Sequence, residues 1–125
     1  MATHYFTVEE ANALLPTIKP LMDELMARRA IVVESRQELS EFLRSHQSDI
    51  GGPAISKLVN EFIVIERLAK KIRSYGCLIR DLNKGLIDFL AVREERDVFL
   101  CWRHGEPKVE YFHELHSGFT GRQRI

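Results

Sequence analysis

Residues Cys77–Leu115, CLIRDLNKGLIDFLAVREERDVFLCWRHGEPKVEYFHEL, decide the fold of this chain. Four short runs rich in β-branched and aromatic residues alternate there with NKG, REER and HGEP, which are sequences typical of turns. Asn83 and Gly85 tolerate the left-handed backbone of a tight hairpin, and Gly105 with Pro107 suits the last turn. We expect a small antiparallel sheet of three or four strands.

A helical region of about residues 8–75 precedes this sheet. Thr7 and Glu10 fit a capping box, in which each side chain bonds the other residue's backbone amide, so the helix begins immediately after Thr7. Pro16 lacks an amide hydrogen and disfavours helical geometry at the residue before it. We therefore expect a short first helix, with Thr17 capping a second helix and Pro20 in that helix's first turn.

The second helix should be long, because its apolar residues recur at intervals of seven and form a coiled-coil-like seam. The seam consists of Ile18, Leu25, Val32 and Leu39, joined by Leu21, Met22 and Leu43. Arg29 and Arg36 occupy the other seam position, where a long stem packs while its charge reaches water. The alternative is that these arginines pair with Glu61 or Glu66 across the hairpin.

The segment His46–Pro53, HQSDIGGP, collects turn residues and should reverse the chain. A second apolar seam follows, made of Ile55, Phe62 and Ala69 together with Leu58, Ile65 and Ile72. Two seams joined by a short loop predict a long antiparallel helical hairpin that packs on the sheet. Its arms of about 28 and 22 residues, roughly 42 and 33 Å long, exceed the width of a small sheet, so part should project or contact another subunit.

The turns also predict the strand register. If the HGEP turn pairs Arg103 with Lys108, one face carries the pairs Trp102 with Val109, Leu100 with Tyr111, and Val98 with His113. The REER turn adds Ala91, Phe89 and Ile87 to that face, which we expect against the helices. The opposite face would then carry Leu78, Leu90, Phe99, Cys101 and Phe112, with Arg80 near Asp88 and Arg103 near Glu110.

This opposite face is too apolar to remain in water. After the helical hairpin, no remaining element of the chain is large enough to cover it. We therefore expect self-association, most simply as a two-fold homodimer in which either these faces or the projecting hairpins meet. A slip of one residue in any turn would exchange the two faces of the affected strand.

Composition limits the function. The 125 residues predict a single α+β domain, residues 1–125, and Lys plus Arg equal Asp plus Glu at 18 each, so no overall field favours nucleic acid. The start of the chain has no signal-peptide pattern and no apolar run is long enough for a membrane span, which predicts a soluble cytoplasmic protein. Cys77 and Cys101 form no CxxC pair, so we expect reduced thiols.

The end of the chain, from Cys101 onwards, is dense in side chains that bind metals. Imidazole and carboxylate together suit a divalent metal such as zinc, iron or manganese. The candidate ligand or metal residues are Asp81, Asp88, Glu106, His113 and Arg122, followed by Cys101, His104 and His116. His113 and His116 would share a face only in a helix, and no HExxH motif is present. We favour the alternative in which His113 is hydrogen-bonded within the sheet and the other two histidines are solvated.

The tail, residues 116–125, contains two glycines around Phe119 and Arg122. Such a loop can approach an anion, with Arg122 supplying the charge. We favour the alternative in which Phe119 anchors the tail in the core while Arg122 pairs with Asp81 or Asp88. The chain has no P-loop, dinucleotide-binding or nucleophile-elbow motif, which removes the support for those three classes of enzyme.

Three stretches resemble the signature blocks of an uncharacterised prokaryotic family, domain of unknown function 2203. They are FTVEEANALLP at 6–16, GCLIRDLNKGLIDF at 76–89 and LCWRHGEPKVEYFHELHSGFTGR at 100–122. The resemblance runs nearly end to end and implies no established activity, substrate or cofactor. The family pattern emphasises positions matching Gly76, Asp81, Gly85, Asp88, Phe89, Cys101, Trp102, Gly105, Glu106, His113, Gly118, Phe119 and Arg122. This sequence departs from that pattern at His104 and His116.

These observations favour a non-enzymatic homodimer that acts as a structural or protein-interaction module, and leave open whether it is an enzyme. The alternative is a metal- or small-ligand-binding protein in which the carboxylates and His113 are ligands or acid–base groups and Arg122 binds an anion. A weaker alternative is nucleic-acid binding through basic residues of the helical hairpin.

Overall fold

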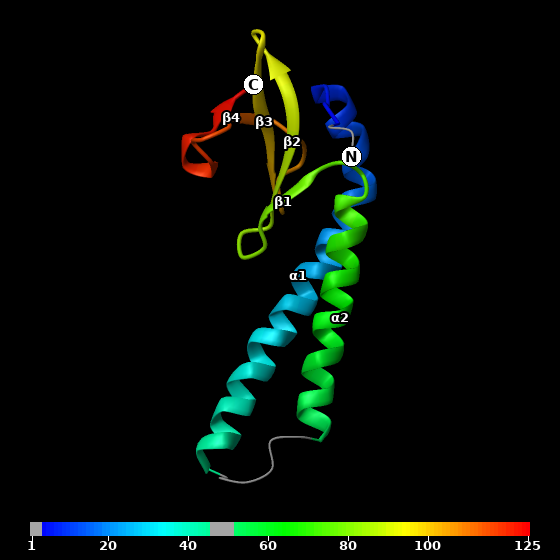
Figure 1. Ribbon diagram of the computed structural model, residues 1–125, viewed down its shortest axis with the longest axis vertical. Coiled ribbons are helices and arrows are strands. Elements are labelled where there is room, and N and C mark those ends of the chain that lie inside the picture. Colours follow the sequence, from blue (N-terminus) through cyan, green and yellow to red (C-terminus); the bar gives the residue numbers. More distant parts are fainter. Residues whose placement is uncertain (1–3, 46–51) are drawn as a thin grey trace.

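The computed structural model of the protein describes residues 4–45 and 52–125 (Figure 1). Two helices, α1 (Val8–Ser45) and α2 (Pro53–Arg73), form an antiparallel hairpin. They are followed by β1 (Leu78–Asp81), β2 (Leu86–Arg93), β3 (Arg96–Arg103), β4 (Tyr111–Glu114), the 3₁₀ turn η1 (Phe119–Gly121) and β5 (Gln123–Arg124). The five strands form one antiparallel sheet in sequence order. The predicted α+β fold is confirmed with one strand more than expected, and the predicted loop at His46–Pro53 lies mostly outside the described residues.

Helix α1 begins at the predicted capping box and then continues through both prolines. The Thr7 amide donates to Glu10 Oε1 at 2.9 Å, and the Glu10 amide donates to Thr7 Oγ1 at 3.0 Å. The expected break at Pro16 is wrong, because α1 is unbroken. Two interior prolines cost roughly 6 kcal/mol. The neighbouring Leu15, Ile18 and Met22 are buried, and burying three such side chains contributes about 4.5–9 kcal/mol, which offsets that cost.

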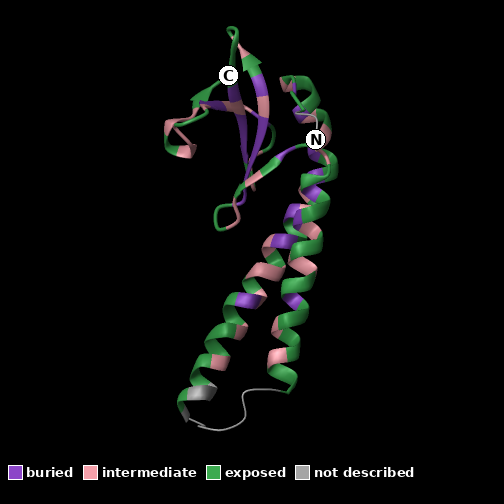
Figure 2. Cartoon of the chain, in the orientation of Figure 1, coloured by how far each residue is buried: buried purple, intermediate pink, exposed green. Residues whose placement is uncertain are grey.

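The hairpin extends well beyond the sheet (Figure 1), and its far part is mostly exposed (Figure 2). The α1 seam is buried at Ile18, Met22, Leu25 and Val32. In α2 the predicted seam position of Phe62 is wrong, because Phe62 is 49% exposed and Glu61 is buried instead. The buried side of α2 at this level therefore lies one residue away from the predicted seam position, where Glu61 pairs with Arg28.

The polar contacts of the hairpin contradict the alternative in which Arg29 pairs with Glu61 or Glu66. Glu61 accepts hydrogen bonds from Arg28 at 3.1 and 3.3 Å, and Glu66 pairs with Arg73. Arg29 instead donates to the side chain of Asn83, in the turn after β1. The hairpin is therefore tied to the β1–β2 turn by a side-chain hydrogen bond as well as by packing.

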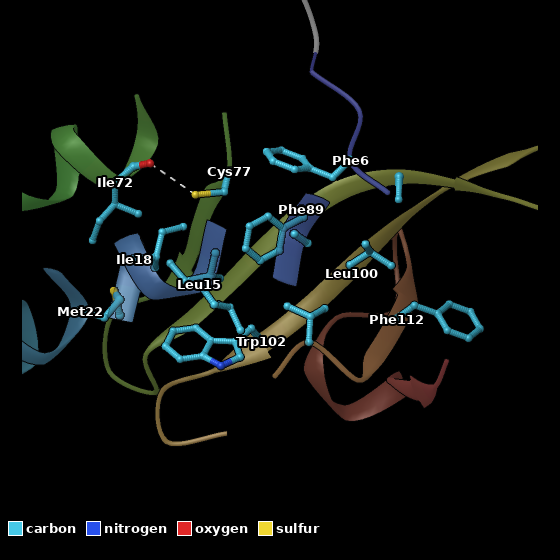
Figure 3. Packing of buried hydrophobic residues seen from close by; sticks show 14 of the residues in the cluster. Phe6, Leu15, Ile18, Met22, Ile72, Cys77, Phe89, Leu100, Trp102 and Phe112 are labelled. Carbon is cyan, nitrogen blue, oxygen red and sulfur yellow. Dashed lines mark hydrogen bonds between the residues drawn. The ribbon is translucent and has the colours of Figure 1, made fainter. Parts of the chain in front are cut away.

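The β2–β3 ribbon has the predicted register and forms the sheet's half of the core (Figure 3). Ile87 pairs with Trp102, Phe89 with Leu100 and Ala91 with Val98, and all six side chains are buried. They pack in one cluster with Leu15, Ile18 and Met22 of α1 and with Ile72 of α2. Glu94 and Glu95 are the two central residues of the REER turn. Their φ values of 51° and 63° match the left-handed backbone of a two-residue hairpin.

The predicted register between β3 and β4 is wrong by one residue. Leu100 pairs with Phe112 and Phe99 with His113, so Phe112 faces the helices while Tyr111 and His113 lie on the opposite face. The cause is a tertiary contact of Val109. Its amide donates to Asn12 Oδ1 at 2.7 Å, and its carbonyl accepts from Asn12 Nδ2 at 3.4 Å. Val109 is thus bonded to α1 rather than to β3, and β4 begins two residues later.

The tail covers part of the opposite face, contrary to the expectation that no element remained to do so. The Arg122 guanidinium lies 4.0 Å from the Tyr111 ring centroid and 4.4 Å from that of Phe119, and β5 pairs with β4. Arg103, expected near Glu110, lies over the Phe119 ring, while Glu110 pairs with Arg124. Leu78 and Val92 remain exposed on this face. The need for a second copy over the sheet is therefore smaller than the sequence suggested.

Replacing Asn12 tests the contact that sets the β4 register. We expect Asn12→Ala to lower the free energy of unfolding by about 1–3 kcal/mol, because it leaves the amide and carbonyl of Val109 without their partner. Asn60→Ala, at an exposed position on α2, is the matched control and should change it by less than about 0.5 kcal/mol. Urea unfolding followed by circular dichroism measures both. Equal effects would show that the Asn12 contact is dispensable.

Candidate functional site

Three buried polar side chains meet on the sheet face turned away from the helices. Asp88 comes from β2, Cys101 from β3 and His113 from β4, and all three are at most 1% exposed. Asp88 and Cys101 are direct cross-strand partners, while His113 is diagonal to Cys101 because its own partner is Phe99. One carboxylate oxygen, the sulfur and one imidazole nitrogen lie within 4.8 Å of one another. We call these three residues the buried cluster.

The hydrogen bonds of His113 fix the position of one of its protons. Its Nδ1 lies 2.8 Å from the backbone carbonyl oxygen of Glu114, and a carbonyl only accepts, so Nδ1 carries a hydrogen. Its Nε2 lies 3.0 Å from Asp88 Oδ2. In the metal-free protein one proton must therefore lie between Nε2 and the carboxylate. Both imidazole nitrogens are thus engaged with groups other than the Cys101 thiol.

Only one of the two carboxylate oxygens of Asp88 has hydrogen-bond partners. Its Oδ2 accepts from Arg80 Nε at 2.8 Å as well as facing His113, which confirms the predicted proximity of Arg80. Its Oδ1 is buried without a hydrogen-bond partner. An unpaired buried acceptor typically costs about 1–3 kcal/mol, so most proteins avoid one.

Burial keeps the Cys101 thiol protonated. Desolvation, and next the negative charge of Asp88, raise the pKa of Cys101 to about 11, while Arg122 acts in the opposite direction. Arg122 is held in place by Glu106, to which it donates at 3.1 and 2.6 Å. The predicted pairing of Arg122 with Asp81 or Asp88 is therefore wrong. Because Glu106 neutralises Arg122 and two aromatic rings cover it, Arg122 is poorly placed to capture a free anion.

The remaining sequence candidates lie apart from the buried cluster. Asp81 Oδ1 accepts from the amides of Asn83 and Lys84 and so closes the turn between β1 and β2. His104 Nε2 lies 2.7 Å from Asp23 Oδ1 on α1. His116 is exposed on the tail. Arg80 lies beside the cluster and is not among the sequence candidates, although its predicted place near Asp88 is a usable signal.

Within the described ranges, no helix is both long and apolar enough to cross a membrane. One family model, described as "Uncharacterized conserved protein (DUF2203)", matches residues 4–125. No curated protein and no solved structure matches the chain. The match spans nearly every residue and includes all three stretches that resemble the family's signature blocks. The chain therefore belongs to the uncharacterised family DUF2203.

Proposed function

We propose that the protein is a non-catalytic interaction module that acts as a homodimer through the outward face of α2. The observation that carries this proposal is an apolar patch on the projecting hairpin. Val59, Phe62 and Ile63 are each about half exposed, at 50%, 49% and 50%. Their spacing puts them on one face of the helix. Clustered exposed apolar side chains of this kind mark protein–protein contact sites.

A second copy is the favoured partner, because an apolar patch on one helix face can pack against the same patch of another copy across a two-fold axis. Arg28 Nη1 lies 3.1 Å from Glu61 Oε1, so these two residues are at the same height along the antiparallel hairpin. Exposed residues beyond it carry both signs on α1, where Arg36 and Arg44 accompany Glu34 and Glu38, whereas Arg67, Lys70 and Lys71 outnumber Glu66 on α2 towards the sheet. A two-fold axis at this level would keep the basic part of α2 in one copy away from the same part in the other, so the two copies avoid repulsion there.

The buried cluster supports the absence of catalysis in this proposal. A cysteine nucleophile needs a base that can take its proton, and both nitrogens of His113 are directed elsewhere. The cluster is also sealed from solvent, which leaves a substrate no approach. Two free, buried thiols, Cys77 and Cys101, fit a reducing compartment, so the proposal includes a cytoplasmic location.

Placing a charge in the apolar patch tests the dimer. Light scattering after gel filtration should give twice the 14.5 kDa chain mass for the unmodified protein. We expect Ile63→Glu to give a monomer, because the new carboxylate would be buried in the interface without a partner. Val92→Glu, at a position 60% exposed on the sheet, is the matched control and should remain dimeric.

An unmodified protein that stays monomeric up to about 100 μM would refute the dimer, since functional homodimers commonly bind far more tightly. An Ile63→Glu variant that remains dimeric would assign the interface to another surface.

Thiol reactivity tests the non-catalytic part of the proposal. We expect neither Cys77 nor Cys101 to react appreciably with a chromogenic disulfide reagent at pH 8 in the folded protein, because both are buried. Both of the chain's two thiols should react once the protein is unfolded in guanidinium. Rapid reaction of one thiol in the folded state would indicate an activated cysteine and contradict the proposal.

A further inference from the structure

We propose that Asp88, Cys101 and His113 bind one zinc ion, which joins strands β2, β3 and β4 on the sheet face away from the helices. This inference is independent of the homodimer, because the buried cluster lies in the sheet and the apolar patch lies on the hairpin. It extends the metal-binding alternative by naming the ligands, the metal and its role.

The distances between the donor atoms suit zinc. Zinc binds oxygen and nitrogen at about 2.0–2.2 Å and sulfur at about 2.3 Å, which places neighbouring ligand atoms roughly 3.3–3.8 Å apart in a tetrahedral site. The three donor atoms of the cluster already lie within 4.8 Å of one another. His113 Nε2 also lies 3.0 Å from Asp88 Oδ2, so the same carboxylate is within reach of the imidazole. Small side-chain rotations would complete the geometry without moving the strands.

His113 has the tautomer that a metal ligand requires. A histidine that binds metal through one nitrogen usually donates its other N–H to a carbonyl or carboxylate, which holds the ring in place. The Nδ1 hydrogen bond to the Glu114 carbonyl, at 2.8 Å, does this for His113. The lone pair of Nε2 then points towards Asp88, and the ion would replace the proton that otherwise lies between them.

The other two ligands also have outer partners. Arg80 donates to Asp88 Oδ2 at 2.8 Å, and Arg122 approaches the sulfur of Cys101 while Glu106 holds it. Such outer hydrogen bonds orient ligating groups and favour their charged forms. The thiol proton of Cys101 and the proton between His113 and Asp88 would both leave to solvent on binding, so that one thiolate and one carboxylate balance the two charges of the ion.

The unpaired oxygen of Asp88 is the independent observation that points to a bound ion. Neither Arg80 nor His113 contacts Oδ1, which is fully buried and has no hydrogen-bond partner. Coordination by Oδ1 would supply the missing partner. A protonated His113 would donate a hydrogen bond to Oδ2 and leave Oδ1 without a partner. A metal ion would give Oδ1 a partner as well.

The donor set selects the metal and its role. One thiolate, one imidazole and one carboxylate suit a borderline-soft ion such as zinc and disfavour magnesium and calcium, which prefer oxygen ligands. The fourth position would be filled by the second oxygen of Asp88 or by a water. Because the cluster is sealed from solvent, the ion would be structural and would link three strands.

The test uses the full chain without an affinity tag, stripped of metal with a chelator and titrated with Co²⁺, a spectroscopic substitute for zinc. We expect one equivalent to give the near-ultraviolet thiolate-to-cobalt absorption, and one equivalent of Zn²⁺ to abolish it. Cys101→Ala should remove the band and weaken Zn²⁺ binding by more than about 100-fold, since losing an outer partner alone costs about 10–100-fold. Cys77→Ala, the other buried cysteine, should leave both unchanged.

Two further variants keep the test decisive. If Cys101→Ala fails to fold by circular dichroism, Asp88→Asn, which keeps the shape of the side chain, should weaken Zn²⁺ binding by more than about 10-fold. His104→Gln removes a histidine outside the cluster and should have no effect. The proposal is overturned if the unmodified protein gives no thiolate band. It is also overturned if a folded Cys101→Ala or Asp88→Asn variant binds Zn²⁺ as tightly as the unmodified protein, or if His104→Gln loses Zn²⁺ binding.

Discussion

The two hydrogen bonds between Asn12 and Val109 determine how the last third of the chain is arranged. They join the first turns of α1 to the segment before β4 and so fix which side chains of β4 face the helices. With this register Phe112 completes the core, and His113 reaches across β3 to Asp88. Shifted by one residue, His113 would lie in the apolar layer and the buried cluster would not exist.

Most of the fold could be predicted because local chemistry determines it. The Thr7–Glu10 capping box needs only four consecutive residues, and the β2–β3 register follows from a two-residue turn and the alternation of apolar side chains. The unbroken α1 and the β3–β4 register could not be predicted. Both depend on contacts between segments far apart in sequence: the packing around Leu15 and Ile18, and the bonds of Asn12.

The candidate site could likewise be predicted only where local chemistry determines it. Residue chemistry was sufficient to select Asp88 and His113 and to note Cys101, but it could not group them, because their grouping depends on the β4 register. It also misassigned Arg122, whose true partner Glu106 lies in the preceding loop. Asp81 has the chemistry of a ligand and serves instead as the acceptor for two backbone amides in a turn.

The sheet covers its second face with guanidinium groups rather than with another layer of helices. Arg80 lies over Phe99, and Arg122 lies over Tyr111 and Phe119. Such stacked cations shield the rings while leaving the charge near water, which suits a chain too short for a second helical layer. It also reduces the apolar area of this face, on which Leu78 and Val92 are the large apolar side chains that remain exposed among the described residues of β1 and β2.

The two outermost strands of the sheet are short, with four residues in β1 and two in β5. Neither edge strand is long enough to pair extensively with the strand of a foreign chain, and beyond β1 the Phe6 amide occupies the Leu90 carbonyl of β2 at 2.7 Å. This brevity protects the protein from the edge-to-edge growth that leads to amyloid fibrils, even where many copies are crowded together.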